Sequence, residues 1–277
     1  MKIDILLSTY NGEQYLQELL QSLKNQNFSD WRLLVRDDGS TDKTVEILDL
    51  FRKENPGKVV WLEADGKNLG PRKSFEVLLR KSTADYIMFC DQDDVWKQDK
   101  IQQTYDRMLA LKQKNQGVPL LVFTDLTVVD EYLNILHPSL WQYTKVNPEN
   151  VKNIYRLLVN NPVVGCTVMI NKTAKSVVLP MPEKALMHDW WMALNISRKG
   201  KVDFVREPSI LYRLHGKNSL GVSEATGKYY LKRTFHFFTT LSQNMNAIRM
   251  LNSLDFSVSV FKFLCYKFVI SFSKVIR

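Results

Sequence analysis

The sequence predicts an α/β protein with a mostly parallel central sheet, helices on both of its faces and a helical extension at the C-terminus. Two observations support this class. Short apolar runs alternate with amphipathic helical stripes between residues 3 and 124, which is the order of a parallel sheet built from crossover units. One run, YIMFC at 86–90, is apolar throughout, as expected of a strand buried on both faces.

The first half of the chain supplies the alternating elements. Each apolar run ends in a turn or a polar loop, and each helical segment has apolar residues three and four positions apart. The predicted strands are 3–8, 31–36, 59–63, 86–90 and 120–124, and the predicted helices are 15–25, 43–53, 72–81 and 97–114.

After Asn134 the alternation stops. We predict a loop at 137–150, a helix at 151–159, a strand at 165–171, a helix from about Met187 to Arg198 and two strands within 202–214 that are split at Pro208. Residues 228–252 and 256–276 read as helices. Because the last segment is rich in Phe and Val, its strand propensity leaves its secondary structure open.

Composition limits the class of protein. The chain has 277 residues, of which 45% are hydrophobic, enough for a substantial core in one large or two small domains. Cys90, Cys166 and Cys265 form no CxxC pair, which argues against a zinc site or a disulfide framework. The start, MKIDILLSTYN, lacks signal-peptide features, so we expect a cytoplasmic protein, peripheral on the inner face of the cell membrane if its tail binds lipid.

The net charge of +9 is concentrated in the tail. Residues 228–277 hold eight basic residues and one acid, which leaves +2 for the remainder of the chain. No helix-turn-helix, zinc-finger or RRM signature accompanies this charge, so we expect no nucleic-acid partner. The last segment, FSVSVFKFLCYKFVISFSKVIR, contains too many lysines for a membrane span. Two interpretations stay open. The segment is a basic amphipathic helix that binds an anionic membrane surface or a partner protein, or it is a last helix that closes the core.

Polar loops follow three of the predicted strands. Ser8, Thr9, Tyr10 and Asn11 follow the first strand and can hydrogen-bond to and stack on a nucleobase, although a turn with an N-cap explains them equally simply. The loop DDGSTD at 37–42 follows the second strand. Its carboxylates can accept from a pyrimidine N–H or a ribose hydroxyl, or form a capping turn.

The third loop is acidic. Asp91, Asp93 and Asp94 follow the strand 86–90, and carboxylates this close repel one another unless a cation or hydrogen-bond donors compensate them. Hard oxygen ligands suit Mg²⁺ or Mn²⁺, and such an ion suits a diphosphate. A solvated acidic turn is the alternative, and we expect Asp94 to cap the following helix. In the turn NLGPR at 68–72, Arg72 can pair with a phosphate or with these acids.

These segments resemble an enzyme family. MKIDILLSTYNG, VRDDGSTD, NLGPRKSF, ADYIMFCDQDDVW and MHDWW are similar, in order, to the motifs of the family 2 glycosyltransferases, which have the GT-A fold and Rossmann-like nucleotide binding. The resemblance covers about residues 1–220. It implies an inverting enzyme that takes a sugar from a nucleoside diphosphate donor with Mn²⁺ or Mg²⁺. It also implies a nucleotide-sugar half at 1–130, an acceptor half at 131–220 and a basic extension at 221–277.

The resemblance also implies roles for individual residues. Ser8, Thr9, Tyr10, Asn11, Asp38, Asn68, Arg72, Asp91 and Gln92 match donor-binding positions, and Asp93 and His215 match metal-binding positions. Asp189 of MHDWW matches the catalytic base at the start of a helix. Trp190, Trp191 and His188 are expected on the acceptor side. Adjacent helical residues point about 100° apart, so we expect at most one of the two tryptophans to face the site.

Several functions stay open. The combination of LLSTYNG, RDDGSTD, CDQDDVW, MHDWW and LYRxH most resembles bacterial rhamnosyltransferases, which use dTDP-L-rhamnose and a saccharide or lipid-linked acceptor in cell-wall or capsular polysaccharide synthesis. A UDP-hexose-dependent relative is the alternative, because similar loops serve UDP-hexoses in this broad family and because PRKSF departs from the rhamnosyl pattern. A sugar nucleotidyltransferase would show a Gly-rich, Arg-bearing loop after the first strand, and a dehydrogenase would show GxGxxG there. A non-catalytic sugar-binding module also fits.

Overall fold

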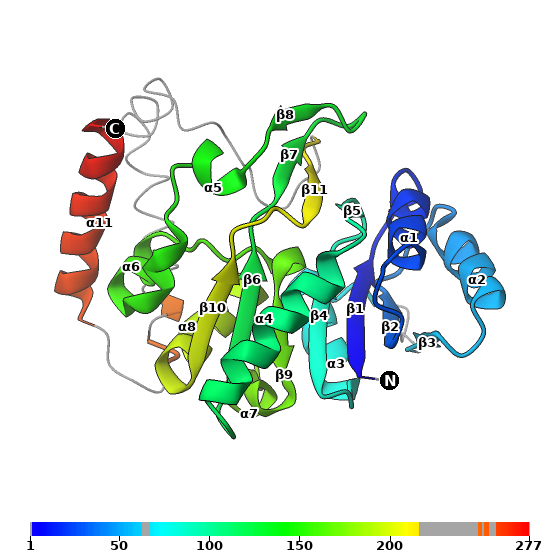
Figure 1. Ribbon diagram of the computed structural model, residues 1–277, viewed down its shortest axis with the longest axis horizontal. Helices are drawn as coiled ribbons and strands as arrows, with labels where there is room; N and C mark the ends of the chain where they lie inside the picture. Colours follow the sequence, from blue (N-terminus) through cyan, green and yellow to red (C-terminus); the bar gives the residue numbers. More distant parts are fainter. Residues whose placement is uncertain (1, 63–66, 216–248, 251, 255–258, 277) are drawn as a thin grey trace.

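The computed structural model describes residues 2–62, 67–215, 249–250, 252–254 and 259–276. Its centre is a seven-stranded sheet (Figure 1). In order across the sheet, the strands are β10 (Lys201–Val205), β6 (Leu120–Thr124), β9 (Met169–Asn171), β4 (Tyr86–Cys90), β1 (Ile3–Thr9), β2 (Trp31–Asp37) and β3 (Val59–Trp61). Neighbouring strands are parallel except at β9, which runs antiparallel to β4 and β6. The predicted α/β class with a mostly parallel sheet is confirmed.

Helices cover both faces of this sheet because successive side chains along a strand point to opposite faces. Along β1, Ile3, Ile5 and Leu7 pack into one core cluster, whereas Leu6 packs into the other. The first cluster includes α1 (Leu16–Lys24), α2 (Thr44–Glu54) and α4 (Lys100–Lys114). The second includes α3 (Pro71–Lys81), α6 (Ile154–Val159) and α8 (His188–Lys199).

A smaller, four-stranded sheet continues the fold beyond the carboxyl end of β4. Its strands, in order, are β5 (Val95–Trp96), β11 (Ile210–Arg213), β7 (Thr127–Val129) and β8 (Ile135–His137). Strand β11 pairs antiparallel with β5 and parallel with β7. This pairing carries the second half of the chain back to the acidic loop, so that His215 comes to lie beside Asp93.

The second half differs from the sequence prediction in its details. The predicted loop 137–150 includes α5 (Leu140–Tyr143) and the start of the 3₁₀ helix η1 (Pro148–Lys152), and the predicted strand 165–171 divides into η2 (Gly165–Thr167) and β9. The short helices η3 (Lys172–Ala174) and α7 (Lys175–Val178) follow. The two strands predicted around Pro208 are confirmed as β10 and β11.

The prediction that Asp94 caps a helix is wrong. Residues 95–96 form β5 instead, so α4 begins at Lys100 and its N-cap residue is Asp99. The Asp94 carboxylate is buried and accepts a hydrogen bond from the backbone N–H of Arg213 at 3.2 Å. The second sheet therefore turns this side chain inward, toward the other acids.

The tail segment is helical where it is described. Helix α11 (Val260–Ile276) lies along α6 at one edge of the molecule, and Phe263 is buried in the core cluster of that face (Figure 1). Within the described residues, no helix is long and apolar enough to cross a membrane. The helix predicted at 228–252 lies outside the described residues apart from 249, 250 and 252.

The predicted division at residue 130 stays a prediction, and β9 and β10 of the second half join the same sheet as β1 to β4.

Candidate active site

A cleft of about 800 Å³ lies at the carboxyl ends of β1, β2 and β4. Its position follows from the parallel sheet, because strands that run in the same direction end at one edge. Among the described residues, the cleft is lined by Ser8, Thr9, Tyr10, Asn11, Gly12, Glu13, Gln14, Tyr15, Asp38, Thr41, Asp42, Asn68, Gly70, Pro71, Phe75, Asp91, Gln92, Asp93, Val164, Gly165, Met187, His188, Asp189, Tyr212 and His215.

Two of the predicted nucleoside contacts in the first loop hold neighbouring loops in place. The Thr9 hydroxyl donates to Asp37 Oδ1 at 2.8 Å, and Asn11 Oδ1 accepts from the backbone N–H of Thr41 at 2.9 Å. Asn11 has a φ of 47°, a left-handed conformation that Asn tolerates better than most residues. The loops after β1 and β2 are thus joined, while the Tyr10 side chain is half exposed at the cleft.

Gln92 connects the loop after β4 to the loop after β1. Its Oε1 accepts from the backbone N–H of Tyr10 at 2.8 Å, and its Nε2 donates to the Tyr10 carbonyl at 3.0 Å. A Cβ atom at Gly12 would lie 2.5 Å from Gln92 Oε1. Glycine at position 12 therefore leaves room for this connection.

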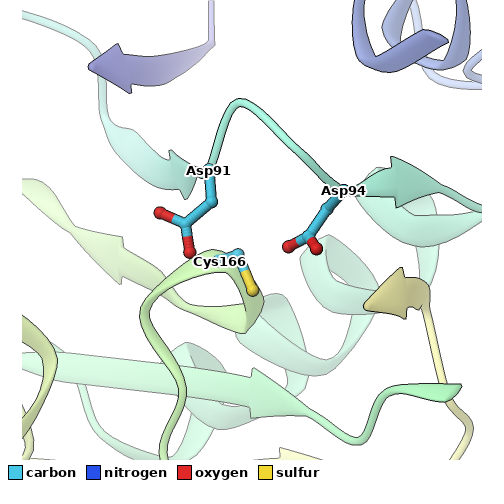
Figure 2. Close-up of side chains that lie close together, drawn as sticks. All are labelled: Asp91, Asp94 and Cys166. Carbon is cyan, nitrogen blue, oxygen red and sulfur yellow. The ribbon is translucent and has the colours of Figure 1, made fainter. Parts of the chain in front are cut away.

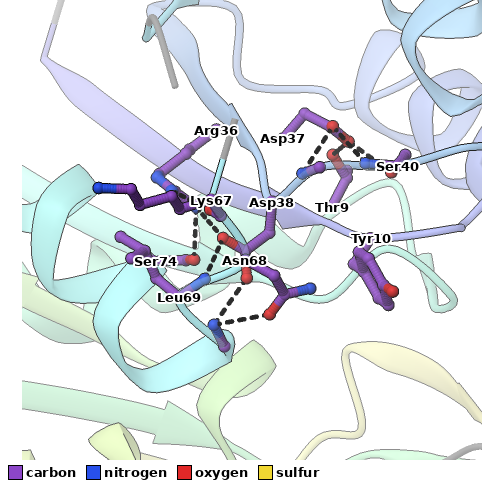
Figure 3. Close-up of polar contacts among 12 residues, drawn as sticks. Thr9, Tyr10, Arg36, Asp37, Asp38, Ser40, Lys67, Asn68, Leu69 and Ser74 are labelled. Carbon is purple, nitrogen blue, oxygen red and sulfur yellow. Dashed lines mark hydrogen bonds and ion pairs between the residues drawn. The ribbon is translucent and has the colours of Figure 1, made fainter. Parts of the chain in front are cut away.

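Asp38 anchors the turn that contains Asn68 (Figure 3). Its carboxylate accepts from the backbone N–H groups of Leu69 at 2.8 Å and Gly70 at 2.7 Å, and forms an ion pair with buried Arg36. Burial opposes ionisation of Asp38, but these hydrogen bonds outweigh it and lower the pKa below its ordinary value. Asp38 is therefore ionised in the wall of the cleft.

Asp93 and His215 come together from the two halves of the chain. His215 Nε2 lies 2.8 Å from Asp93 Oδ2, and the His215 ring lies 5.2 Å from the Tyr15 ring between centroids. A carboxylate oxygen and an imidazole nitrogen are ligands that suit Mn²⁺. This pair, together with the other acids of the loop, fits a divalent cation.

Asp91, Asp94 and Cys166 form a second group beside this pair (Figure 2). One ligand atom from each lies within 4.8 Å of the others. Burial, followed by repulsion from Asp93 and Asp189, raises the pKa of Asp91 to about 7, and burial also raises the pKa of Asp94. Ionising the whole group is unfavourable without positive charge, which a divalent cation or a basic side chain can supply.

Asp189 lies in the first turn of α8 and lines the cleft. Burial raises its pKa to about 6, although hydrogen bonds from the backbone N–H groups of Trp190 and Gly165 act in the opposite direction. A carboxylate with such a pKa is ionised at neutral pH and can take a proton from a hydroxyl group.

His188 is buried beside Asp189. Its ring lies 4.3 Å from the Phe75 ring and 5.5 Å from the Phe89 ring between centroids, and neither ring nitrogen has a hydrogen-bond partner among the described residues. Burial lowers the His188 pKa to about 3, so the ring is neutral. Gly165 makes space for it, since a Cβ atom there would lie 2.6 Å from His188 Nε2.

Three predicted site residues lie outside the cleft lining of the described structure. The Arg72 guanidinium donates to the Met181 and Pro182 carbonyls at 3.3 and 3.1 Å, and Arg72 is not among the described residues that line the cleft. Trp190 Nε1 donates to the Leu157 carbonyl at 3.2 Å, and Trp191 Nε1 donates to the Val178 carbonyl at 2.9 Å. The expected sugar-stacking wall of tryptophan is therefore absent from the described part, because both indoles pack toward the core.

Sequence reasoning missed residues that only the fold brings to the cleft, as for Gly165, or to the acids beside it, as for Cys166 and Lys100. Gly165 and Cys166 precede β9, and β9 runs antiparallel beside β4, so its start meets the end of β4. Lys100 is buried in α4, and its Nζ lies 4.5 Å from the Trp96 ring centroid and interacts electrostatically with Asp94. The only local signal was the Gly165–Cys166 pair before a short strand. Nothing in the neighbouring sequence indicates that this pair lies beside the acidic loop.

The mostly parallel central sheet flanked by helices is a GT-A fold. Two solved structures share the fold, each covering 99% of this chain. TarS of Staphylococcus aureus, residues 1–349 with UDP-GlcNAc, is 18% identical with a TM-score of 0.62, and 73% of it is covered. The mannosyltransferase PcManGT of Pyrobaculum calidifontis with GDP-Man and Mn²⁺ is 14% identical with a TM-score of 0.65, and 72% of it is covered.

Sequence comparison establishes the family. The model of "Glycosyl transferase family 2" matches residues 4–172, more than half of the chain, so the protein belongs to the family 2 glycosyltransferases. It is also similar to the dTDP-rhamnosyl transferase RfbG of Shigella flexneri, with 27% identity over 228 residues that cover 78% of this chain and 74% of RfbG. The resemblance seen in the sequence motifs is confirmed.

Proposed function

We propose that this glycosyltransferase moves a sugar from a nucleoside diphosphate donor to a hydroxyl group with inversion at the anomeric carbon. The observation that carries the proposal is the meeting of Asp189 with Asp91, Asp93 and His215 in one cleft. Inversion in a single step needs one base for the acceptor hydroxyl and positive charge for the departing diphosphate. The cleft offers groups for both tasks.

Asp189 is the proposed base. Its carboxylate is buried and held by the backbone N–H groups of Trp190 and Gly165, so its orientation is set before an acceptor arrives. As the acceptor oxygen attacks the anomeric carbon, its proton passes to Asp189 and the bond to the diphosphate breaks. His188, in the preceding position, is proposed to contribute to the acceptor side as a neutral imidazole.

Asp93 and His215 are the proposed holders of Mn²⁺ or Mg²⁺, with Asp91 toward the donor. A bound cation would stabilise the charge that develops on the leaving diphosphate. Ser8, Tyr10, Asn68 and Gln92 belong to the proposed nucleoside side, where Thr9, Asn11 and Asp38 fix the loops.

The proposed donor is dTDP-L-rhamnose and the proposed acceptor is a saccharide or a lipid-linked saccharide of a bacterial surface polysaccharide. The similarity to RfbG over most of both chains supports this choice. TarS, named a poly(ribitol-phosphate) β-N-acetylglucosaminyltransferase, supports a UDP-hexose as the alternative donor. The family membership makes a nucleotidyltransferase the weaker explanation.

A donor screen tests the proposal. Thermal shift with Mn²⁺ would compare dTDP-L-rhamnose with UDP-glucose, UDP-galactose and UDP-GlcNAc, and release of nucleoside diphosphate would be followed with saccharide and lipid-linked acceptors. We expect the largest shift and release with dTDP-L-rhamnose, and an inverted anomeric centre in the product by NMR. Stabilisation by a donor without release under any condition would instead identify a binding module.

The metal assignment has its own test. Replacing a metal ligand typically lowers affinity at least about tenfold, as second-shell changes already do. We expect His215→Gln to weaken Mn²⁺ binding by that factor in calorimetry. His137→Gln is the matched control, because His137 bonds the Ser139 backbone outside the cleft. Equal Mn²⁺ affinity in wild type and His215→Gln would remove His215 from the proposed metal site.

A further inference from the structure

Helix α11 has two different sides. One side packs on α6: Phe263 is buried, and the Tyr266 ring stacks on the Tyr155 ring with centroids 5.3 Å apart. At 100° per residue, the opposite side carries Phe261, Leu264, Phe268 and Val269, which we call the outer face. These side chains are 77%, 45%, 73% and 62% exposed. The sequence left open whether this segment closes the core or meets a membrane, and its geometry is suited to both.

Basic residues border the outer face. Lys262 lies on one side of the outer face and Lys267 lies on the other, since successive residues are rotated by 100° around the helix axis. Their ammonium groups lie 5.8 Å from the Tyr155 ring centroid and 5.9 Å from the Phe263 ring centroid, at the boundary with the packed side. The sequence from Ser259 to Ile276 contains no acidic residue.

An apolar strip bordered by lysines matches the surface of an anionic bilayer. Aromatic and aliphatic side chains enter the boundary between headgroups and acyl chains, while lysines remain with the phosphate groups. The positive border provides the charge complementarity that favours anionic lipid. Because one side of α11 is packed on α6 and the other is exposed along its length, the helix would lie parallel to the bilayer surface.

We propose that the outer face of α11 docks the enzyme on an anionic lipid bilayer while its other side remains packed on α6. Helix α6 also contacts α8, whose first turn holds Asp189. Helices α1 and α2 lie at the opposite end of the sheet from α11 (Figure 1). Docking therefore leaves the predicted nucleotide side of the cleft open to solvent. The proposal goes beyond sugar transfer and is independent of the donor's identity.

The test is sedimentation of the full chain with vesicles of phosphatidylcholine, with and without phosphatidylglycerol. We expect Phe261→Ser/Phe268→Ser to lower the partition coefficient at least about tenfold, because two exposed rings no longer leave water. Lys262→Gln/Lys267→Gln should lower it about fivefold per lysine and reduce the preference for phosphatidylglycerol. Ile135→Ser/Leu136→Ser is the matched control, since these side chains of β8 are 66% and 51% exposed.

Three results would overturn the proposal. These are wild-type vesicle binding by the serine variant, binding that is equal with and without phosphatidylglycerol, and a wild-type dimer that the serine variant dissociates in sedimentation equilibrium. The last would make a second copy of the chain the occupant of the outer face. Unfolding in urea checks that the variants are folded, because changes at exposed positions should leave the midpoint unchanged. Vesicle binding is measured without donor or acceptor, so its outcome is separate from the test of sugar transfer.

Discussion

Replacing Asp189 by Asn should increase the stability of the protein at neutral pH and strongly reduce its sugar-transfer activity. Burial raises the Asp189 pKa from 3.8 to about 6. At about 1.4 kcal/mol per pH unit, the ionised carboxylate costs the folded state roughly 3 kcal/mol. Asn keeps an oxygen that can accept from the backbone N–H of Trp190 and carries no charge, so it avoids most of this cost.

The direction of the Asp189 pKa shift determines the pH range in which Asp189→Asn stabilises the protein. A raised folded-state pKa means that the folded protein holds the proton more tightly than the unfolded chain, so the cost is complete above about pH 6 and vanishes below about pH 3.8. The stability gain of Asp189→Asn should therefore approach 3 kcal/mol near pH 8 and shrink as the pH falls through about 6. Urea unfolding of both proteins across this range measures it.

Sugar transfer by the same variant should fall about 10²–10⁴-fold, the contribution of a positioned general base, while donor binding stays near wild type. Asp125→Asn is the matched control: burial also raises the Asp125 pKa, but its carboxylate bonds Ser139 and the Leu126 backbone N–H away from the cleft. It should keep full activity. Wild-type transfer by Asp189→Asn would refute the base assignment, and no stability gain near pH 8 would refute the burial argument.

Three further predictions concern the same cleft. Transfer by the wild type should decline about tenfold per pH unit below about pH 6 as Asp189 becomes protonated, and a flat pH profile of kcat would contradict this. Asp38→Asn should lower the unfolding free energy by about 3–5 kcal/mol in urea, because buried Arg36 loses its counter-charge; an unchanged midpoint would show that the ion pair does not stabilise the fold. Gly165→Ala should lower the unfolding free energy by about 1–3 kcal/mol and reduce kcat, because the added Cβ would displace the His188 ring. Wild-type stability in urea together with a wild-type kcat would contradict this prediction.

Much of the fold could be predicted because its signals are local. An apolar run of five residues, YIMFC, occupies β4 with the predicted bounds, and the run 120–124 occupies β6 in the same way. Alternation of such runs with helical stripes leaves few topologies, and parallel strands bring the loops that follow them to one edge. Ser8, Asp38, Asp91 and Asp93 therefore meet in the cleft as the sequence predicted.

The sequence by itself determined the class of fold, the positions of the polar loops and the basic character of the tail, because periodicity and motifs act within a few residues. The tertiary structure decided which way individual side chains turn. Insertion of β9 brought Cys166 to the acids, β5 and β11 turned Asp94 inward, and contacts with distant carbonyls held Arg72 and both tryptophans away from the cleft. The two sides of α11 likewise depend on α6, because a helix buries only the face that a neighbour covers.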